Sequence, residues 1–590
     1  MEFSGMGAVV TPEGVGFRVW APHASAVAVV GEFNDWTSDA NQLAGEGNGN
    51  WAGFVPDAKA GQEYKFQITN GEQVLTKVDP YAAHVTNSVG NGVIYDHDAF
   101  DWAGDEFTPP TFNELVIYEL HAGTFASQAD GEVSDLDEMA EKLGHIVKLG
   151  ANAIQLMPVA EFAGDYSWGY NPAHIFAVES AYGGPDALKR LVKQAHALGL
   201  AVIQDVVYNH FGPSDLNLWQ FDGWSEDDKG GIYFFNDWRS TTPWGDTRPD
   251  YGRGEVRQFI HDNAFAWLER FHMDGLRYDM TPYMRDVDGS GFDIPEGWDL
   301  CRWINTDIRS KYPEKILIAE DLHSNPAVSS TGPEGAAFHA QWDAQFVHPV
   351  REAITVAEDQ YRSTDEVLGA VGYSYGDAFA RVIYTESHDE VANGKARVPE
   401  EIDADDPTGY FAKKRSTLGA GLVLTSPGIP MLFQGQEFLE GGWFRDNVAL
   451  DWDRSDDFHG IVKLYRDLIR LRLNRDSLSA GLTGSGLRVI HNNDAENVIA
   501  FQRWREHGVG DDVVVIANLS NQTRTDYRIG LPAAGKWQLL FDGDSAMYSE
   551  DFGEHAARDL VASAEAYDGL DASAEISIAP YTLLIYGWRG

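Results

Sequence analysis

Two carboxylate side chains at the ends of short apolar segments are the residues best suited to chemistry. Asp279 ends the segment Gly275-Leu-Arg-Tyr-Asp279, and Glu320 ends Ile316-Leu-Ile-Ala-Glu320. Short apolar runs between helical patterns are typical of buried parallel strands, and a parallel barrel carries its reactive groups at the C-terminal strand ends. A nucleophilic carboxylate beside a protonated acid is the pair that cleaves a glycosidic bond with retention. The sequence therefore predicts sugar chemistry at a barrel mouth.

Further polar residues fall at other predicted strand ends. Arg277 precedes Asp279 by two positions, so both side chains share one face of the strand, where the guanidinium is expected to keep the carboxylate ionised. Asp205 ends another predicted strand, and His210 follows it closely. For Glu320 we expect burial and nearby carboxylates to raise the pKa, as a general acid requires.

A fourth segment, Glu386-Ser-His388-Asp389, adds an imidazole and a carboxylate. We expect His388 and His210 to donate hydrogen bonds to sugar hydroxyls, and Asp389 to hold two hydroxyls as the ring flattens toward an oxocarbenium ion. Each piece alone is more often structural: an Arg-x-Asp is commonly an ion pair, and a His-Asp a turn. Their joint placement favours a site, because buried charges are rarely kept without a function.

Strands and helices alternate after about residue 112, which predicts a (β/α)₈ barrel. Helical patterns at Asp186–Leu198, Glu255–Phe271 and Trp298–Ser310 lie between predicted strands. The eight predicted strands are Leu115–Glu119, Ala153–Met157, Ala201–Asp205, Gly275–Asp279, Ile316–Glu320, Gln341–Phe346, Val382–Glu386 and Met431–Gln434.

Short alternating strands flank this central part. We predict an N-terminal β-sandwich over residues 1–105, a catalytic barrel over 106–480 and a C-terminal β-sandwich over 481–590. The barrel contains an aromatic-rich loop, 211–253, which forms either a platform that stacks on sugar faces or a small packed core of its own. Its aromatic residues are Trp219, Trp224, Tyr233, Phe234, Phe235, Trp238 and Trp244.

Composition narrows the function classes. With 91 acidic and 44 basic side chains the net charge is −47, which opposes nucleic-acid binding and favours a soluble, salt-tolerant surface over a site for cationic ligands. The single cysteine, Cys301, excludes an intramolecular disulfide framework. Neither a signal-peptide pattern nor a bilayer-length apolar stretch is recognisable. We therefore expect a cytoplasmic protein without a membrane partner.

The segments around Asp205, Asp279, Glu320 and Asp389 resemble the four signature regions of the α-amylase family of glycoside hydrolases, in order and spacing. The resemblance implies that Asp279 is the nucleophile, Glu320 the acid/base and Asp389 the transition-state stabiliser. It also implies substrate-binding residues. These are Tyr170, in the motif Ser167-Trp-Gly-Tyr170, together with Asp205, His210, Arg277 and His388.

Subfamily features are mixed. Gly16-Phe-Arg-Val-Trp-Ala-Pro22 and Gly31-Glu-Phe-Asn-Asp-Trp36 resemble both glycogen branching enzymes and maltooligosyltrehalose trehalohydrolases. Asp205-Val-Val-Tyr-Asn-His-Phe-Gly-Pro213 looks like a trehalohydrolase, whereas Glu386-Ser-His-Asp-Glu-Val-Ala-Asn-Gly394 looks like a branching enzyme. Met280 departs from the small residue common after the nucleophile, and its thioether is a candidate for narrowing the site.

The favoured function is a branching-type glucanotransferase that cleaves α-1,4 bonds and transfers the chain to a 6-hydroxyl. A trehalohydrolase or amylase-like hydrolase is the alternative. The presence of Asp279, Glu320 and Asp389 argues against a third hypothesis, a glucan-binding protein without catalytic activity. No organic cofactor is predicted, since no glycine-rich phosphate motif joins a strand to a helix, and too few oxygen ligands accompany Asn209 to predict calcium. The expected partner is an α-1,4-glucan or maltooligosaccharide; oligomeric state is not encoded in any recognisable feature.

Overall fold

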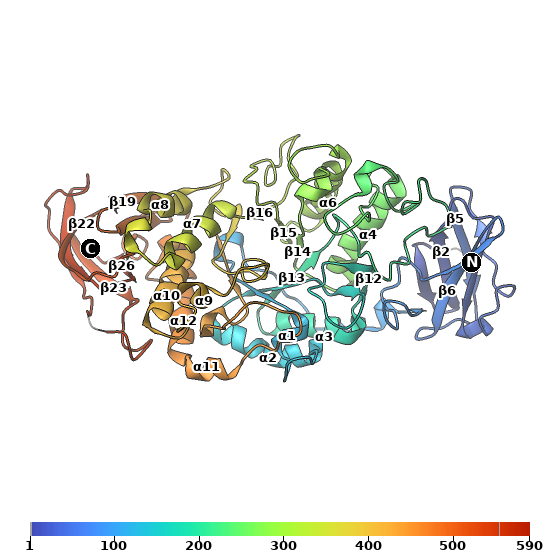
Figure 1. The fold of residues 1–590 in the computed structure, drawn as a ribbon, viewed down its shortest axis with the longest axis horizontal. Helices are drawn as coiled ribbons and strands as arrows, with labels where there is room; N and C mark the ends of the chain where they lie inside the picture. The colour runs from blue at the N-terminus through green and yellow to red at the C-terminus, as the bar shows by residue number, and fades with distance from the viewer. Residues whose placement is uncertain (1–2, 554) are drawn as a thin grey trace.

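The computed structural model describes residues 3–553 and 555–590. The molecule is elongated, with β-sheets at each end and a mixed helix–strand body between them (Figure 1). The N-terminus lies in one of the terminal β-domains and the C-terminus in the other.

The N-terminal β-domain consists of two antiparallel sheets. Residues Tyr64, Phe66 and Ile68 alternate inward along one strand, as a half-buried strand requires, and the rings of Tyr64 and Phe66 pack against Phe17 of the facing sheet. The first sheet contains β1 (Gly7–Thr11), β2 (Gly14–Trp20), β5 (Asn50–Val55) and β4 (Ala44–Gly45). The second contains β3 (Ala26–Gly31), β6 (Glu63–Asn70), β7 (Gln73–Lys77) and β8 (Gly92–Val93).

The central body is a closed parallel barrel, which confirms the predicted fold class. Every residue of its strands is buried, because side chains alternate between the filled interior and the surrounding helices. Its strands are β9 (Ile117–Leu120), β10 (Ala153–Leu156), β13 (Ala201–Val206), β14 (Gly275–Tyr278), β15 (Ile316–Ala319), β16 (Ala340–Trp342), β17 (Arg381–Ile383) and β18 (Ile429–Phe433). A small hairpin of β11 (Ala160–Phe162) and β12 (Pro172–Val178) follows β10.

Helices surround the barrel and complete its connections. The longer ones are amphipathic: α2 buries Met139, Leu143 and Ile146 on one face. The helices are α1 (Ala122–Phe125), α2 (Leu136–Leu149), α3 (Gly184–Ala197), α4 (Gly254–Arg270), α5 (Pro282–Arg285), α6 (Pro295–Lys311), α7 (Ala344–Thr355), α8 (Thr364–Gly372), α9 (Val398–Ile402), α10 (Tyr410–Thr425), α11 (Asp453–Asp457) and α12 (His459–Arg472).

The sixth predicted strand, Gln341–Phe346, is wrong in its second half. The strand ends at Trp342, and α7 begins two residues later. Asp343 causes the change, because its carboxylate accepts a hydrogen bond from the Gln345 amide at 3.1 Å and caps the helix.

The C-terminal β-domain contains two antiparallel sheets around their own core, which includes Trp537, Ile529 and Ile576. The larger sheet contains β19 (Gly486–Asn493), β20 (Val498–Trp504), β21 (Val513–Asn518), β26 (Thr582–Trp588), β23 (Gly535–Asp542) and β24 (Leu560–Ala562). The smaller contains β22 (Arg524–Leu531) and β25 (Ala572–Ile578). In the described residues no helix has the length and apolarity to cross a membrane.

Candidate active site

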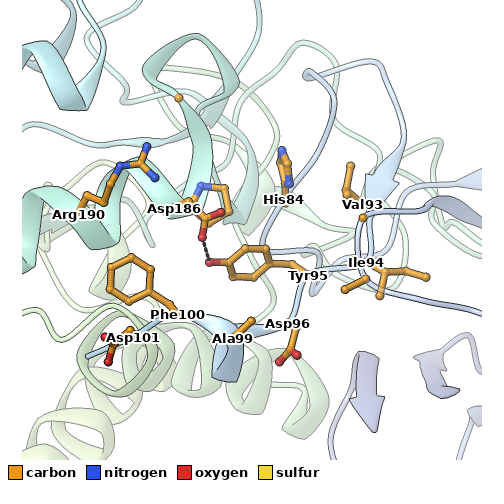
Figure 2. A pocket seen from close by; sticks show the side chains of 14 residues that line it. His84, Val93, Ile94, Tyr95, Asp96, Ala99, Phe100, Asp101, Asp186 and Arg190 are labelled. Carbon is orange, nitrogen blue, oxygen red and sulfur yellow. Dashed lines mark hydrogen bonds between the residues drawn. The ribbon is translucent and has the colours of Figure 1, made fainter. Parts of the chain in front are cut away.

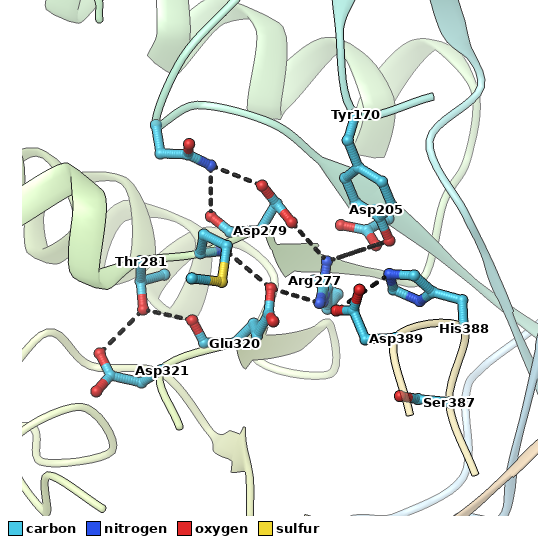
Figure 3. A network of polar contacts seen from close by, with 12 residues as sticks. Tyr170, Asp205, Arg277, Asp279, Thr281, Glu320, Asp321, Ser387, His388 and Asp389 are labelled. Carbon is cyan, nitrogen blue, oxygen red and sulfur yellow. Dashed lines mark hydrogen bonds and ion pairs between the residues drawn. The ribbon is translucent and has the colours of Figure 1, made fainter. Parts of the chain in front are cut away.

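Arg277 is the centre of a buried polar network at the C-terminal ends of the barrel strands (Figure 3). Its Nη1 donates to Asp205 Oδ2 at 2.7 Å and to Asp279 Oδ1 at 3.2 Å. Its Nη2 forms an ion pair with Glu320 Oε2 at 2.7 Å. One guanidinium therefore joins three carboxylates from three neighbouring strands, and it brings together the two carboxylates predicted to react.

The backbone after Asp279 is fixed against Glu320. The Met280 amide donates to Glu320 Oε2 at 3.0 Å, and the Thr281 amide donates to the Glu320 carbonyl at 2.9 Å. Met280 has a φ of +37°, a left-handed conformation that costs a side-chain-bearing residue free energy. This local strain accompanies the hydrogen bond that places Met280 beside the predicted acid.

Asn209 links Asp279 to His210. The Asn209 amide group donates to Asp279 Oδ2 at 2.7 Å and to the Asp279 carbonyl at 2.9 Å. Its Oδ1 therefore faces His210 Nδ1, 2.5 Å away, and can only accept, so the imidazole proton is on Nδ1. Nε2 of His210 is then a hydrogen-bond acceptor, which differs from the donor role expected from the sequence.

His388 lies on another side of the same network. Its Nδ1 contacts Glu119 Oε1 at 2.8 Å, and its Nε2 lies 3.4 Å from Asp389 Oδ2. The Tyr170 ring stacks on the imidazole at 5.0 Å, and the Tyr170 hydroxyl donates to Asp205 Oδ2 at 2.8 Å. Asp389 is the most exposed of the predicted site carboxylates, at 39% of its side chain.

The loop before Tyr170 has a geometric requirement for glycine. Gly169 has a φ of +94°, and a Cβ on it would lie 2.2 Å from the Pro158 carbonyl oxygen. The motif Ser167-Trp-Gly-Tyr170 therefore turns tightly against the segment after β10 and directs the tyrosine toward the network.

The charges of the network shift several pKa values. Burial raises the pKa of Asp279 well above its ordinary value, the charge of Glu320 adds to this, and Arg277 opposes it. Burial also raises the pKa of Asp205 to about 6. From the sequence we expected the Arg277 guanidinium to keep Asp279 ionised. In the structure, burial and the charge of Glu320 outweigh the effect of the guanidinium on the pKa of Asp279.

The two predicted histidines are in opposite charge states. Burial would lower the pKa of His388, but the charges of Asp389 and Glu119 outweigh it and raise the value to about 9. Burial lowers the pKa of His210 to about 3; a hydrogen bond with the Tyr170 backbone opposes this shift, and the charge of Arg248 adds to it. At neutral pH the site therefore contains a cationic donor, His388, and a neutral acceptor, His210.

The aromatic loop 211–253 is mainly a packed core. Tyr233, Phe234 and Phe235 are buried, and Trp224 stacks on His23 of the N-terminal domain at 4.8 Å. Burial therefore excludes Tyr233, Phe234 and Phe235 from a sugar platform and assigns them to the packed-core alternative. Trp238 is 60% exposed, and Trp244 is partly exposed beside His210.

A separate cavity of about 570 Å³ lies where the N-terminal domain meets α3 (Figure 2). It is lined by Tyr95, Phe100 and Asp186, among others, and the Tyr95 hydroxyl donates to Asp186 at 2.7 Å. Asp186 is exposed, and Arg190 at the rim pairs with Asp137. Exposed and paired charges do not make a reaction centre, so the network around Arg277 is the candidate site.

Two residues that were not predicted from the sequence, Glu119 and Trp342, contact His388 and Arg277 of the site. Glu119, fully buried at the end of β9, accepts from both the ring and the amide of His388. The Trp342 ring lies 4.2 Å from the Arg277 guanidinium carbon, as a cation–π contact. The signal for Glu119 was present, since it is a carboxylate at the end of a predicted strand. Throughout residues 3–553 and 555–590, no cluster of three or more histidine, cysteine or carboxylate side chains is arranged to hold a metal ion.

Comparison with known proteins places these features in a family. Family models match carbohydrate-binding module 48 (isoamylase N-terminal domain) at residues 5–82, the α-amylase catalytic domain at 119–249 and the α-amylase C-terminal all-β domain at 489–589. The 1,4-α-glucan branching enzyme GlgB of Corynebacterium jeikeium is 32% identical, over 98% of this chain and 82% of the relative. That of Marinobacter nauticus is 31% identical, over 97% and 94%. A structure of pullulanase type I from Bacillus subtilis complexed with maltose shares the fold, with a TM-score of 0.79 and 22% identity over 100% of this chain and 86% of that one.

Proposed function

The chain belongs to the α-amylase family and is a relative of the GlgB branching enzymes, and from that premise we propose that it is a branching-type glucanotransferase working through a covalent glycosyl-enzyme. The observation that carries the proposal is the single guanidinium of Arg277, which holds Asp279 and Glu320 together. Retaining enzymes hold their two carboxyl groups about 5–5.5 Å apart, closer than inverting ones do, and a guanidinium shared by both groups brings them near each other.

In the first step, a carboxylate oxygen of Asp279 attacks the anomeric carbon of an α-1,4-linked glucosyl unit. The glycosidic C–O bond breaks, and Glu320 transfers its proton to the departing 4-oxygen. Burial and the charge of Glu320 raise the pKa of Asp279, so this pair of close, buried carboxyl groups retains a proton, which has to leave Asp279 before the attack. Substrate binding then needs only to place that proton on Glu320.

In the second step, the 6-hydroxyl of an acceptor chain attacks the anomeric carbon of the glycosyl-enzyme. Glu320, now a carboxylate, takes the hydroxyl proton, and the ester bond to Asp279 breaks. The cationic His388 donates to a hydroxyl of the bound sugar while the neutral His210 accepts from another. Asp389, less tightly held than the other carboxylates, adjusts to the flattened ring of the transition state.

A hydrolase on the same scaffold is the second candidate. It is favoured by the segment Asp205-Val-Val-Tyr-Asn-His-Phe-Gly-Pro213, which resembles trehalohydrolases. In that case water replaces the acceptor hydroxyl in the second step, with the same residues in the same roles.

Proton NMR of amylose incubated with the purified protein tests the proposal, with reducing ends counted in parallel and the Asp279→Asn variant as the blank. Branching transfer predicts a growing α-1,6 anomeric signal at nearly constant reducing ends. Reducing ends that rise without a new linkage would reject transfer in favour of hydrolysis, and maltooligosyl trehalose would then be the next substrate to examine.

A further inference from the structure

Trp244, in the loop between β13 and α4, covers one face of the His210 ring. The two rings are nearly parallel, with an interplanar angle of 13° and centroids 4.5 Å apart. Tyr283 packs edge-on against the indole at 5.1 Å. His210 is fully buried and Trp244 is partly exposed, so the indole shields one face of the imidazole.

The loop around Trp244 is itself held in place. The Trp244 amide donates to Thr242 Oγ1 at 3.2 Å, and the Thr242 amide donates to the Gly245 carbonyl at 2.9 Å, which closes a tight turn. Gly245 has a φ of +145°, a conformation that favours glycine. Arg248, fully buried, donates to the Val287 carbonyl at 3.0 Å and thereby ties this loop to the segment that follows the nucleophile strand.

The orientation of His210 matters because a chain of hydrogen bonds joins it to Asp279. Nδ1 of His210 donates to Asn209, and Asn209 in turn donates to Asp279 Oδ2. Nε2 of His210 is buried and, among the residues the structure describes, has no hydrogen-bond partner. A buried acceptor without a partner is costly unless a ligand supplies the donor. A rotation of the ring would break the hydrogen bond to Asn209. It would also turn Nε2 away from its present direction.

The charge state of His210 depends on the same contacts. The groups facing the ring are the Asn209 amide, the Tyr170 backbone, the Trp244 indole and the charge of Arg248, with Asp279 beyond Asn209. Burial, to which the indole contributes, is the main reason that its pKa is lowered to about 3. A neutral ring keeps Nε2 free of a proton and able to accept from a hydroxyl.

We propose that Trp244 is a positioning residue, which holds the neutral His210 ring so that Nε2 accepts a hydrogen bond from a hydroxyl of the sugar bound over Asp279. The inference rests on the proposed function for the identity of the ligand as an α-glucan. It assigns to the aromatic loop 211–253 a direct role in the donor site, through one tryptophan, where most of the loop's other aromatic residues form a packed core. Trp244 acts through His210 and is not itself in contact with the reacting atoms.

The test compares Trp244→Phe, Trp244→Leu and Trp244→Ala with the matched control Trp224→Ala. The control removes a tryptophan of the same loop that also stacks on a histidine, His23, at 4.8 Å, but in the N-terminal domain. Turnover of amylose is measured from pH 5 to 8, and the His210 ring is followed by NMR of histidine-labelled protein, assigned with His210→Gln. Thermal unfolding verifies that each variant is folded. Trp244→Leu retains more side-chain volume and serves as the test variant if Trp244→Ala does not fold.

We expect Trp244→Ala and Trp244→Leu to lower kcat by about 10²-fold, the scale of a misplaced binding group, with a smaller change in KM. The NMR shifts of the His210 ring should not change between pH 5 and 8 in the parent. In these variants the ring should titrate near its ordinary pKa of 6.5, and turnover should fall below that pH. Trp244→Phe should restore most of kcat, and His210→Ala should cost little more in a Trp244→Ala background.

Additive losses in the double variant, or a silent His210 ring in both folded Trp244→Leu and Trp244→Ala, would overturn the positioning role. The NMR titration needs no substrate, so it separates this failure from failure of the proposed function. A parent protein that leaves amylose unchanged would overturn the glucan hydroxyl as the ligand, even if the ring titrates as expected.

Discussion

Buried carboxylates and histidines gather at both ends of the barrel, but the two clusters are built differently. At the N-terminal end, His196 lies between Asp105 and Asp274, with ring nitrogens 2.6 and 2.9 Å from their carboxylate oxygens. His272 contacts the second oxygen of Asp105 at 2.6 Å, and Lys315 lies 3.3 Å from the second oxygen of Asp274. Every carboxylate oxygen of this cluster therefore has a donor.

At the C-terminal end, by contrast, several buried polar atoms lack a hydrogen-bond partner in the described residues. Within the described part of the chain, Asp205 Oδ1, His210 Nε2 and Arg277 Nε are buried without hydrogen-bond partners. Saturated polar clusters stabilise a fold, whereas groups left unsatisfied in a barrel mouth remain available to a ligand. The first cluster therefore ties the segment containing Asp105 to the barrel floor, whereas the second contains polar atoms without a protein partner, which the proposed function assigns to substrate.

Removal of the nucleophile should give the largest effect. Asp279→Asn should lower turnover of α-glucan by about 10⁴-fold or more, the scale for loss of an essential nucleophile. The melting temperature should stay or rise, because the change removes one of three buried carboxyl groups that share one guanidinium and compete to ionise there. Activity assays and calorimetry on the same preparation measure turnover and melting temperature. A lower melting temperature with unchanged turnover would contradict the proposed difference between the two ends of the barrel.

The opposite pattern is expected at the barrel floor. Asp274→Asn breaks a fully buried pair with His196 and should cost about 3–5 kcal/mol of unfolding free energy. Because Asp274 is at the end of the barrel away from Asp279, kcat below the unfolding transition should stay within about threefold of the parent, as for independent sites. Denaturant unfolding and assays at low temperature measure the two quantities. A large fall in kcat with little loss of unfolding free energy would show that the cluster at the barrel floor contributes to the reaction.

The floor cluster should also make stability depend on pH. Burial would lower the pKa of His196, but the hydrogen bonds and charges of Asp274 and Asp105 raise it above 6.5 overall. Burial would raise the pKa of Asp105, but the two histidines lower it below 3.8 overall. The cluster's contribution is therefore present from about pH 4 to 6.5, falls as pH rises through the raised pKa of His196, and falls as pH drops through the lowered pKa of Asp105.

His196→Gln isolates this dependence. The difference in unfolding free energy between parent and variant should be greatest near pH 5–6 and should shrink as pH increases above 6.5. Urea unfolding across this range measures it, and a difference that grows with pH would contradict the assignment of a cationic His196.

The smallest predicted effect concerns backbone strain beside the acid. Met280→Gly should raise stability by up to about 1 kcal/mol, since glycine adopts the left-handed φ of +37° without penalty. The hypothesis that the Met280 thioether narrows the site further predicts a changed ratio of transfer to hydrolysis. Unfolding and product analysis test this together; unchanged products would remove Met280 from acceptor selection.

The sequence was most informative where local pattern and chemistry coincide. The strands ending near Asp279 and Glu320 were predictable from their apolar runs, and parallel strands bring their C-terminal ends to one rim. The start of α7 was missed because a single cap, Asp343, decides between strand and helix there. The contact of Trp244 with His210 and the bridge from Asp105 to Asp274 through His196 were beyond reach, since long-range side-chain packing sets both.

Direct detection of the covalent intermediate tests the central claim. The Glu320→Gln variant, incubated with α-maltosyl fluoride, should form the glycosyl-enzyme, since fluoride departs without an acid, and should release it slowly without the base. Peptide mass spectrometry is expected to find a maltosyl group on Asp279, with none in an Asp279→Asn, Glu320→Gln double variant. A maltosyl group on another residue, or a product of inverted configuration with no adduct, would contradict the account.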